Sequence, residues 1–302
     1  MPSTARQMFK VGISEPVNTV LAIWMADAAG LYTQHGLAVE IANMNGGSRG
    51  AAELAAGRLD AMHVGLSAVV RLNRAGADLR IVAALANVIR FAIFTAPGVR
   101  DAAALKGGVV AVTTFGSESD TVATLALKRL GLSRDDVAVK EYGSARRRIE
   151  ALQSGEIQAT ALNEPAASLA RAQGLPALLD LVTERIPWLF TGIAVRREAI
   201  ETRREQLSRF IAATALGNRL ALNDAARARV VLAERAGIGD GHVLDIAYRD
   251  FAAMSPPDIA PTVAAAQNVL AQFPPDGSTD VADYVDFGIL KDLKRQGAAA
   301  LS

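Results

Sequence analysis

The sequence predicts an α/β protein in which two similar lobes face each other across a cleft, and two observations predict it. First, one pattern of strand, turn, helix and strand occurs twice, over residues 39–61 and 137–159. A leucine, a glycine and an alanine recur at the same offsets in both copies: Leu54, Gly57 and Ala61 correspond to Leu152, Gly155 and Ala159. Second, strands alternate with helices, which is typical of parallel sheets. Ligands of open α/β sheets bind beyond the carboxyl ends of the strands, so the duplicated turns are the first place to expect a site.

The individual elements follow from apolar runs separated by glycine-rich or polar turns. A strand is expected over 9–14 and a helix over 20–29, with Trp24 of that helix in the core. Further strands are expected over 37–44, 59–64, 79–85, 90–95, 109–113, 137–141 and 157–162. Helices are expected over 49–56 and 118–130, and three more end near residues 73, 153 and 173. Beyond residue 196 the chain is expected to be helical, over 198–222, 225–236 and 261–272.

Two apolar stretches, 79–95 and 189–195, lie between the repeated units and are interpreted as linkers that cross between the lobes. The predicted lobe 1 is therefore discontinuous, with residues 1–90 and 190–302, and lobe 2 comprises residues 91–189. A chain that crosses twice makes a two-strand hinge, which resists twisting and can bend to close around a ligand.

Composition excludes several classes of protein. The chain has 302 residues, 51% of them hydrophobic, and a formal net charge of +1, which gives no support for a nucleic-acid partner. It has no cysteine, so disulfides, thiolate metal sites and cysteine nucleophiles are excluded. No apolar run reaches the ~18 residues of a membrane span. The first ten residues, MPSTARQMFK, lack the apolar core of a signal peptide, so none is expected in this chain.

Catalytic and metal motifs are not expected. The histidines His35, His63 and His242 are far apart in sequence and show no metal-ligand spacing. His63 lies in an apolar strand and is interpreted as a buried histidine with satisfied hydrogen bonds. The basic run 146–148 is followed by Glu150 and is interpreted as a solvated helix face. No catalytic residue, cofactor or metal is therefore predicted.

Binding gives the stronger signal, because small polar residues occupy several turns between a strand and a helix. Small residues let a ligand approach the backbone closely, and the free N–H groups at helix starts suit an anionic group. A single such turn is an ordinary helix cap, but the repeated arrangement on both lobes favours a site. The residues concerned are Ser14, Asn18, Gly46, Gly47, Ser48, Gly65, Ser67, Thr113, Thr114, Gly116, Ser117, Gly143, Ser144, Asn163 and Glu164.

Arg90 is a separate candidate, together with Asn87 three residues before it. Arg90 lies in an otherwise apolar run at the expected hinge, where a charge needs a partner or water. Two interpretations stay open: a guanidinium that pairs with a ligand carboxylate or sulfonate, or a surface arginine on an edge strand.

The sequence also resembles a known protein family. The motifs that carry the resemblance are Ala29-Gly30-Leu31-Tyr32, His35-Gly36-Leu37, Gly57-Arg58-Leu59-Asp60-Ala61, Leu105-Lys106-Gly107, Ala151-Leu152-Gln153-Ser154-Gly155 and Asn163-Glu164-Pro165. Their order and spacing, over about residues 9–195, are similar to those of substrate-binding proteins of nitrate/sulfonate/taurine-type ABC importers. The resemblance implies a type II periplasmic-binding-protein fold, a periplasmic monomer, and delivery of a small molecule to a membrane permease.

The family's ligand contacts map onto the loop after the first strand, the turn after the second, and the opposing helix start. Carried over by position, they are Ser14, Glu15, Asn18, Gly46, Gly47, Ser48, Ser67, Thr114, Phe115, Gly116, Ser117 and Asn163. Glu15 would repel a simple anion, so the ligand is expected to carry a cationic or hydroxyl group as well.

The main hypothesis is a binding protein for a small anionic organic molecule: a sulfonate, a nitrate-like ion, an aromatic carboxylate or a pyrimidine. The alternative is an enzyme on the same scaffold, a decarboxylase or lyase of an aromatic acid that uses Arg90, His63 or Glu164. A sensing domain of a regulator would need a helix-turn-helix segment, for which the residues before the first predicted strand leave no room. A cytoplasmic location stays open beside the periplasmic one.

Overall fold

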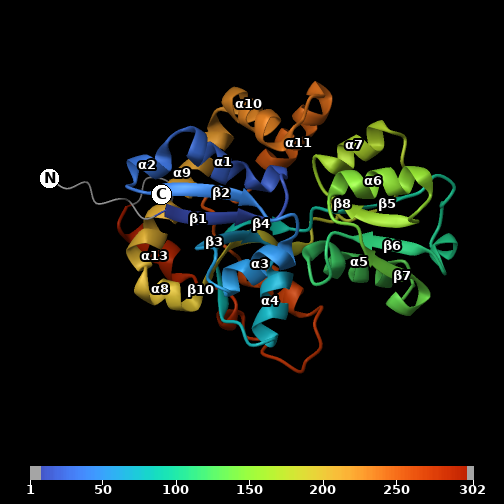
Figure 1. Cartoon of the computed structure of the whole chain (residues 1–302), viewed down its shortest axis with the longest axis horizontal. Coiled ribbons are helices and arrows are strands. Elements are labelled where there is room, and N and C mark those ends of the chain that lie inside the picture. The colour runs from blue at the N-terminus through green and yellow to red at the C-terminus, as the bar shows by residue number, and fades with distance from the viewer. Residues whose placement is uncertain (1–7, 298–302) are drawn as a thin grey trace.

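The computed structural model describes residues 8–297, and its strands form two five-stranded sheets that lie end to end (Figure 1). We call each sheet with its covering helices a lobe. The lobe 1 sheet has the order β2-β1-β3-β10-β4. Its strands are β1 (Met8–Ile13), β2 (Ala38–Asn43), β3 (Ala61–Val64), β4 (Leu79–Val88) and β10 (Pro187–Arg196).

The lobe 2 sheet has the order β7-β6-β8-β5-β9. Its strands are β5 (Ala92–Thr95), β6 (Val109–Val112), β7 (Ala138–Glu141), β8 (Ala159–Leu162) and β9 (Ala177–Asp180). The short strand β9 has no counterpart among the predicted strands.

The repeat seen in the sequence produces the same local topology twice. In each lobe the first strand of the repeated topology lies between its second and third strands and is parallel to both: β1 between β2 and β3, and β6 between β7 and β8. The next strand in each sheet, β10 or β5, is antiparallel to its neighbours. Each sheet is therefore mixed, and the expectation of parallel sheets holds only for the repeated strands.

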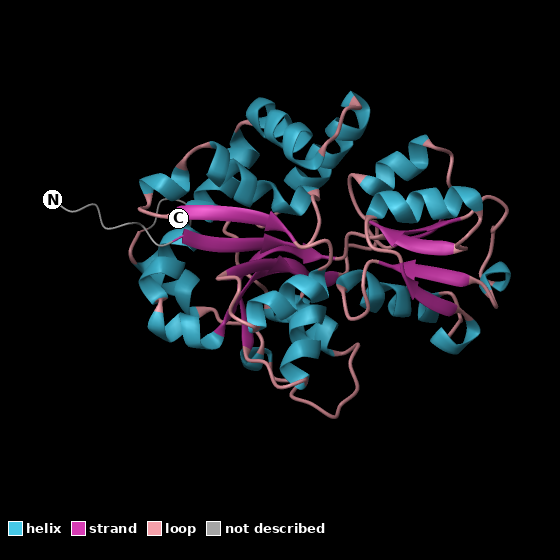
Figure 2. Cartoon of the chain, in the orientation of Figure 1, coloured by secondary structure: helices cyan, strands magenta, loops and turns pink. Residues whose placement is uncertain are grey.

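Helices cover both faces of the two sheets (Figure 2). Those of lobe 1 are α1 (Leu21–Ala28), α2 (Leu31–Gln34), α3 (Gly47–Ala55), α4 (Leu66–Arg74), α8 (Arg197–Thr202), α9 (Arg204–Asn223), α10 (Ala225–Ala236), α11 (Gly241–Met254), α12 (Val263–Leu270) and α13 (Gly288–Arg295). Those of lobe 2 are α5 (Glu118–Arg129), α6 (Ala145–Ser154) and α7 (Ala166–Ala172). The predicted helix 198–222 is interrupted at Arg203, and α11 and α13 were not predicted.

One apolar core fills the face of the lobe 1 sheet covered by α1, α9, α10 and α11, and it contains the buried Trp24, as predicted. A second core lies on the face covered by α3, α4 and α12 and continues into lobe 2 through Phe91 and Phe190. These two rings pack edge to face with their centroids 5.1 Å apart. The lobes are therefore joined by apolar packing as well as by the chain itself.

The interpretation of residues 79–95 and 189–195 as linkers is wrong for most of their length. β4 and β10 are paired antiparallel strands of the lobe 1 sheet, β10 internal and β4 at the edge, and both of their faces are buried over most of their length. A continuous apolar run is what a strand buried on both faces requires. β10 begins at Pro187, so the boundary at residue 189 falls inside it.

The true crossings are the short segments 89–91 and 181–186. They are hydrogen-bonded to each other: Ile89 N donates to Ile186 O, and Leu181 N donates to Phe91 O, both at 3.1 Å. The hinge is therefore a pair of coupled segments.

Candidate functional site

A cavity of about 50 Å³ lies where the carboxyl ends of strands from the two lobes meet. Its lining includes the apolar side chains of Val17, Phe91 and Phe190, and it also carries hydroxyls, the Asn163 amide and two carboxyl groups. Its full lining is Ser14, Glu15, Val17, Gly47, Gly65, Phe91, Thr113, Ser117, Glu118, Ser119, Asn163, Phe190 and Thr191. The Thr191 hydroxyl is buried and has no hydrogen-bond partner among the described residues. A small molecule with polar and apolar parts would complement these walls.

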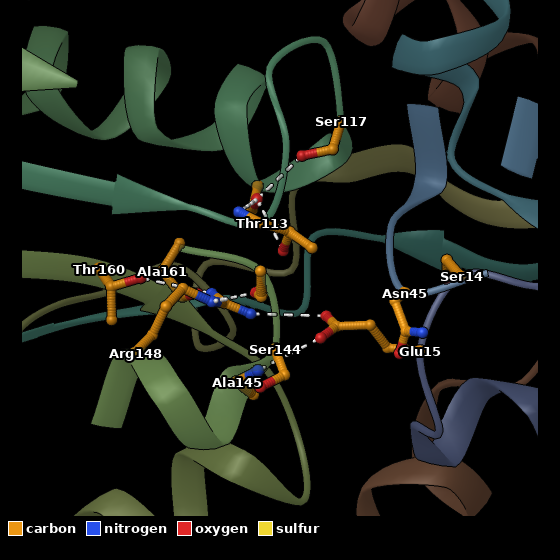
Figure 3. A network of polar contacts seen from close by, with 12 residues as sticks. Ser14, Glu15, Asn45, Thr113, Ser117, Ser144, Ala145, Arg148, Thr160 and Ala161 are labelled. Carbon is orange, nitrogen blue, oxygen red and sulfur yellow. Dashed lines mark hydrogen bonds and ion pairs between the residues drawn. The ribbon is translucent and has the colours of Figure 1, made fainter. Parts of the chain in front are cut away.

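Glu15 reaches from lobe 1 into lobe 2 (Figure 3). It follows β1, and its carboxylate accepts a hydrogen bond from the backbone N–H of Ala145, in the first turn of α6, at 3.2 Å. Its other oxygen lies 3.4 Å from Nη2 of Arg148. Burial raises the pKa of Glu15, and the Arg148 charge and the Ala145 N–H oppose this shift. The carboxylate thus lies where the positive end of α6 and a guanidinium both attract it.

Arg148 is buried, and its side chain is only 1% exposed. Within lobe 2 its Nη1 donates to Ala161 O at 2.7 Å and to the Thr160 hydroxyl at 3.3 Å, and its Nε donates to Gly143 O. These bonds fix the guanidinium and direct Nη2 toward lobe 1 (Figure 3). The interpretation of the basic run as a solvated face is therefore wrong for Arg148, although its exposed neighbour Arg146 pairs with Glu150 as expected.

A second contact between the lobes joins the rim of the site. The hydroxyls of Ser48, in the first turn of α3, and Thr114, after β6, lie 2.7 Å apart. Gly46 has φ = 150°, and a Cβ there would come within 2.9 Å of the Thr114 methyl group. A glycine is therefore required for Thr114 to approach the start of α3.

Glu118 crosses in the opposite direction, from the first turn of α5 into lobe 1. Its carboxylate accepts hydrogen bonds from Trp188 Nε1 and from the backbone N–H of Ser67. A Cβ on Gly65 would lie 2.1 Å from the Glu118 Oε2 atom. Burial raises the pKa of Glu118 to about 7, and the hydrogen bonds from Trp188 and Ser67 limit the rise. Near neutral pH this buried carboxyl group is therefore partly protonated.

The hydroxyls of Thr113, Ser117 and Ser119 form a third group. Ser119 Oγ accepts from Thr113 N at 2.9 Å and lies 2.9 Å from Ser117 Oγ (Figure 3). They hold the turn between β6 and α5 in the shape that lines the cavity.

Arg90 lies at the hinge and is buried, so the interpretation as a surface arginine is wrong. Its Nη2 pairs with Asp250 of α11, and Asn18 Nδ2 donates to the same carboxylate at 2.8 Å. Its Nε and Nη1 have no partner within residues 8–297. Asn87 donates to Ala260 O at 2.8 Å. These three predicted site residues therefore connect the hinge and the β1–α1 loop to the C-terminal part of lobe 1, outside the cavity lining.

His63 is buried between two hydroxyls, as predicted. Its Nδ1 lies 3.2 Å from Ser14 Oγ and its Nε2 3.0 Å from Thr19 Oγ1. Burial lowers its pKa to about 4, so the ring is neutral. His63 thus fixes the loop after β1 that carries Glu15.

Five of the residues carried over as ligand contacts line the cavity: Ser14, Glu15, Gly47, Ser117 and Asn163. Gly65 and Thr113, from the turns with small polar residues, line it as well. Gly46, Ser48, Thr114 and Gly116 lie at the rim, Ser67 supports Glu118, and Phe115 projects outward with 51% of its surface exposed. The residues that sequence reasoning missed are Arg148, Glu118, Thr191 and the Phe91–Phe190 pair. Glu118 alone had a usable signal, because it is an acidic residue in the first turn of a helix that follows a Gly-Ser turn.

Among residues 8–297, no group of three or more histidine, aspartate or glutamate side chains could hold a metal ion. No helix in this described part of the chain is long and apolar enough to cross a membrane.

The two lobes and the cavity between them define the architecture of a periplasmic binding protein, which confirms the predicted fold class. The profile of the NMT1-like family matches residues 6–234, which is most of the chain. The protein therefore belongs to the NMT1-like family. No curated protein matches the sequence.

Solved structures agree with this assignment. A protein from Bordetella bronchiseptica RB50 is 21% identical, with a TM-score of 0.85, and the match covers 97% of this chain and 98% of that one. The alkanesulfonate-binding protein SsuA from Xanthomonas axonopodis pv. citri, bound to MOPS, is 19% identical, with a TM-score of 0.75 and coverage of 89% and 92%. The periplasmic nitrate-binding protein NrtA from Synechocystis PCC 6803 is 14% identical, with a TM-score of 0.76 and coverage of 99% and 90%. The predicted resemblance is confirmed by the family and the shared fold.

Proposed function

We propose that this protein is the solute-binding component of an ABC importer and captures a small anionic organic molecule between its two lobes. The ligand classes that fit are a sulfonate, a nitrate-like ion, an aromatic carboxylate or a pyrimidine. The protein would act as a monomer in the periplasm and deliver its ligand to a membrane permease.

The observation that carries this proposal is the cavity at the junction of the lobes, to which both lobes contribute. A ligand that touches both lobes stabilises the arrangement in which they meet, and this is how binding drives closure. The unpartnered Thr191 hydroxyl offers the ligand a hydrogen bond at a buried position. Two of the structural neighbours, SsuA and NrtA, are described as binding an alkanesulfonate and nitrate.

The chemistry of the lining supports a ligand with more than one kind of group. The two carboxyl groups of Glu15 and Glu118 favour hydrogen-bond donors, whereas the N-terminus of α6 and Arg148 favour an acidic group. Phe91, Phe190 and Val17 suit a short apolar portion between them. A nitrate-like ion would use only the polar part of this lining, whereas a sulfonate or carboxylate that carries an apolar portion would contact Phe91, Phe190 and Val17 as well.

The residues predicted for an enzyme do not converge on the cavity. His63 is enclosed between Ser14 and Thr19, Arg90 is paired with Asp250, and Glu164 accepts from Ser168 N and pairs with Arg171. None of the three lines the cavity. This arrangement favours binding over turnover.

A thermal-shift screen of sulfonates, carboxylates, nitrate and pyrimidines tests the proposal. A ligand at 100-fold over its dissociation constant adds about 2.7 kcal/mol to the free energy of unfolding. We expect one class to raise the melting temperature and to be recovered unchanged by NMR after incubation. A screen in which no compound stabilises the protein, or in which the bound compound is converted, would contradict the proposal.

A further inference from the structure

Arg148 depends on the opposite lobe for its counter-charge. Its contacts within lobe 2 are two carbonyl oxygens and a hydroxyl, all of them neutral, and the carboxylate it meets belongs to Glu15 of lobe 1. A buried guanidinium without a nearby anion is costly. If the lobes separate, Arg148 loses its anion and the N-terminus of α6 loses its acceptor at the same moment.

The geometry around the Glu15 carboxylate is that of an acid-binding site. One oxygen accepts from the Ala145 N–H at 3.2 Å and the other faces Arg148 Nη2 at 3.4 Å, so each oxygen has its own donor. Both donors are held by lobe 2 alone: the guanidinium by Gly143, Thr160 and Ala161, and the N–H by the helix. Any group with two acceptor oxygens, such as a carboxylate or a sulfonate, fits the same pair of donors.

We propose that the N-terminus of α6 and Arg148 form the subsite for the acidic group of the ligand, and that the Glu15 carboxylate is a built-in occupant which the ligand displaces. This inference rests on the proposed function and names the part of the site that recognises the ligand's charge. Glu15 lines the cavity and contacts Arg148 and Ala145, which do not line it, and we expect its withdrawal to open the two donors to the cavity. Only a ligand with an acidic group can replace it without leaving Arg148 unpaired.

The displacement has a consequence for specificity. A neutral molecule gains nothing from Arg148, because the Glu15 carboxylate already pairs with this guanidinium. The acidic group of a ligand can take the place of the Glu15 carboxylate, because both carry the same charge. The exchange leaves Glu15 near the bound ligand, where it can accept from an amino or hydroxyl group. A ligand with an acidic group and a donor is therefore favoured over a bare anion.

The test removes the Glu15 carboxylate and supplies it again as acetate. The chain has no cysteine, so two spin labels can be placed through Ala52→Cys on α3 and Lys128→Cys on α5, both exposed and in different lobes. We expect Glu15→Ala to lengthen the distance between the labels in pulsed EPR, and millimolar acetate or methanesulfonate to restore it. The same anions leave the wild-type distance unchanged. Glu150→Ala, which removes a carboxylate of a surface pair on α6, is the matched control and stays at the wild-type distance.

A second measurement locates the added anion. In a crystal of Glu15→Ala grown with acetate, the carboxylate is expected on Ala145 N and Arg148 Nη2. Adding Arg148→Lys to Glu15→Ala keeps the charge and removes the directed donor. We expect this double variant to need an about tenfold higher acetate concentration to restore the short distance between the labels, because one charge-assisted hydrogen bond is lost. Wild-type spacing in Glu15→Ala, or no response to either anion, overturns the proposal.

The two proposals fail in different ways. If acetate restores closure but no solute binds the wild-type protein, the subsite stands and the proposed function falls. If a solute binds the wild type and Glu15→Ala equally well and acetate has no effect, the function stands and the subsite falls.

Discussion

In lobe 1 the N-cap of the helix after β2 is Gly46, and in lobe 2 the N-cap of the corresponding helix after β7 is Ser144. The first helical hydrogen bonds are equivalent, from Gly50 N to Gly46 O and from Arg148 N to Ser144 O. Each helix start meets a loop of the other lobe: the start of α3 meets the loop after β6, and the start of α6 meets the loop after β1. The start of α3 meets the neutral hydroxyl of Thr114, whereas the start of α6 meets the carboxylate of Glu15.

The difference arises from one position in the repeat. Arg148 of lobe 2 corresponds to Gly50 of lobe 1, where a Cβ would lie 2.2 Å from Met62 Cε. In lobe 1 the glycine at this position lets α3 pack closely on β3, and no charge lies there. In lobe 2 the same position of α6 carries the guanidinium of Arg148. Two copies of one backbone unit thus provide a neutral contact on one side of the cleft and a charged contact on the other.

The largest expected effect comes from removing the cation that distinguishes lobe 2. Arg148→Met leaves the Glu15 carboxylate without its counter-charge and three acceptors of lobe 2 without their donor, and breaking a buried pair in this way costs about 3–5 kcal/mol. We expect urea unfolding to show a loss of that order. Arg146→Met, two residues earlier and exposed, is the control and should change the free energy of unfolding by less than about 0.5 kcal/mol. Equal effects of the two substitutions would remove the distinction between the lobes.

Gly65→Ala tests the place where lobe 1 receives Glu118. The added methyl group would overlap the Glu118 carboxylate and the Phe190 carbonyl, and overpacking of this kind costs about 1–3 kcal/mol. We expect calorimetry to show ligand affinity reduced by up to about 100-fold. Gly239→Ala, where no atom lies within 4 Å of the new methyl, should keep full affinity. Normal affinity in Gly65→Ala would mean that Glu118 need not enter lobe 1.

The proton on Glu118 should make stability depend on pH. Its pKa is raised from 4.5 to about 7 in the folded protein, so the folded state binds the proton more tightly than the unfolded state. Glu118 therefore destabilises the protein least below pH 4.5, and stability falls as pH rises through 7, by at most about 1.4 kcal/mol per pH unit. We expect urea midpoints of the wild type to fall between pH 5 and 8 relative to those of Glu118→Gln. Parallel curves for the two proteins would refute this assignment.

Thr114→Ala should have the smallest effect, because the contact it removes is neutral and lies at the rim. Loss of one such hydrogen bond costs about 0.5–1.5 kcal/mol, a factor of roughly 2–10 in ligand affinity. Ser48→Ala should give the same loss, and the double variant should lose no more than either alone. Additive losses would show that the two hydroxyls act independently.

The repeated unit was predictable because its signals are local. Glycines such as Gly57 and Gly155 mark where each helix ends, and both have a positive φ in the structure. The loop after β1 and the turn at Gly46 and Gly47 were also recognisable, because polar and small residues follow short apolar runs. These features pointed to residues that line the cavity, including Glu15 and Ser117.

What could not be predicted depends on contacts between distant segments. Arg148 appears in the sequence as one of three arginines, and only the carbonyl groups of Gly143 and Ala161 distinguish it from its exposed neighbours. β10 reads as an apolar run, and its place between β3 and β4 is set by pairing with residues about a hundred or more positions away. Arg90 had no visible partner because Asp250 is 160 positions away.

The hinge also makes the smaller lobe an insertion. Val88 and Pro187 are paired neighbours in β4 and β10, and the chain between them leaves and returns at one place. A short turn that joined these two residues would make β4 and β10 a hairpin and leave every strand pair of the larger sheet intact. Lobe 1 is in this sense a complete fold into which lobe 2 is inserted. A reporter domain with closely spaced ends could therefore replace lobe 2 between Val88 and Pro187.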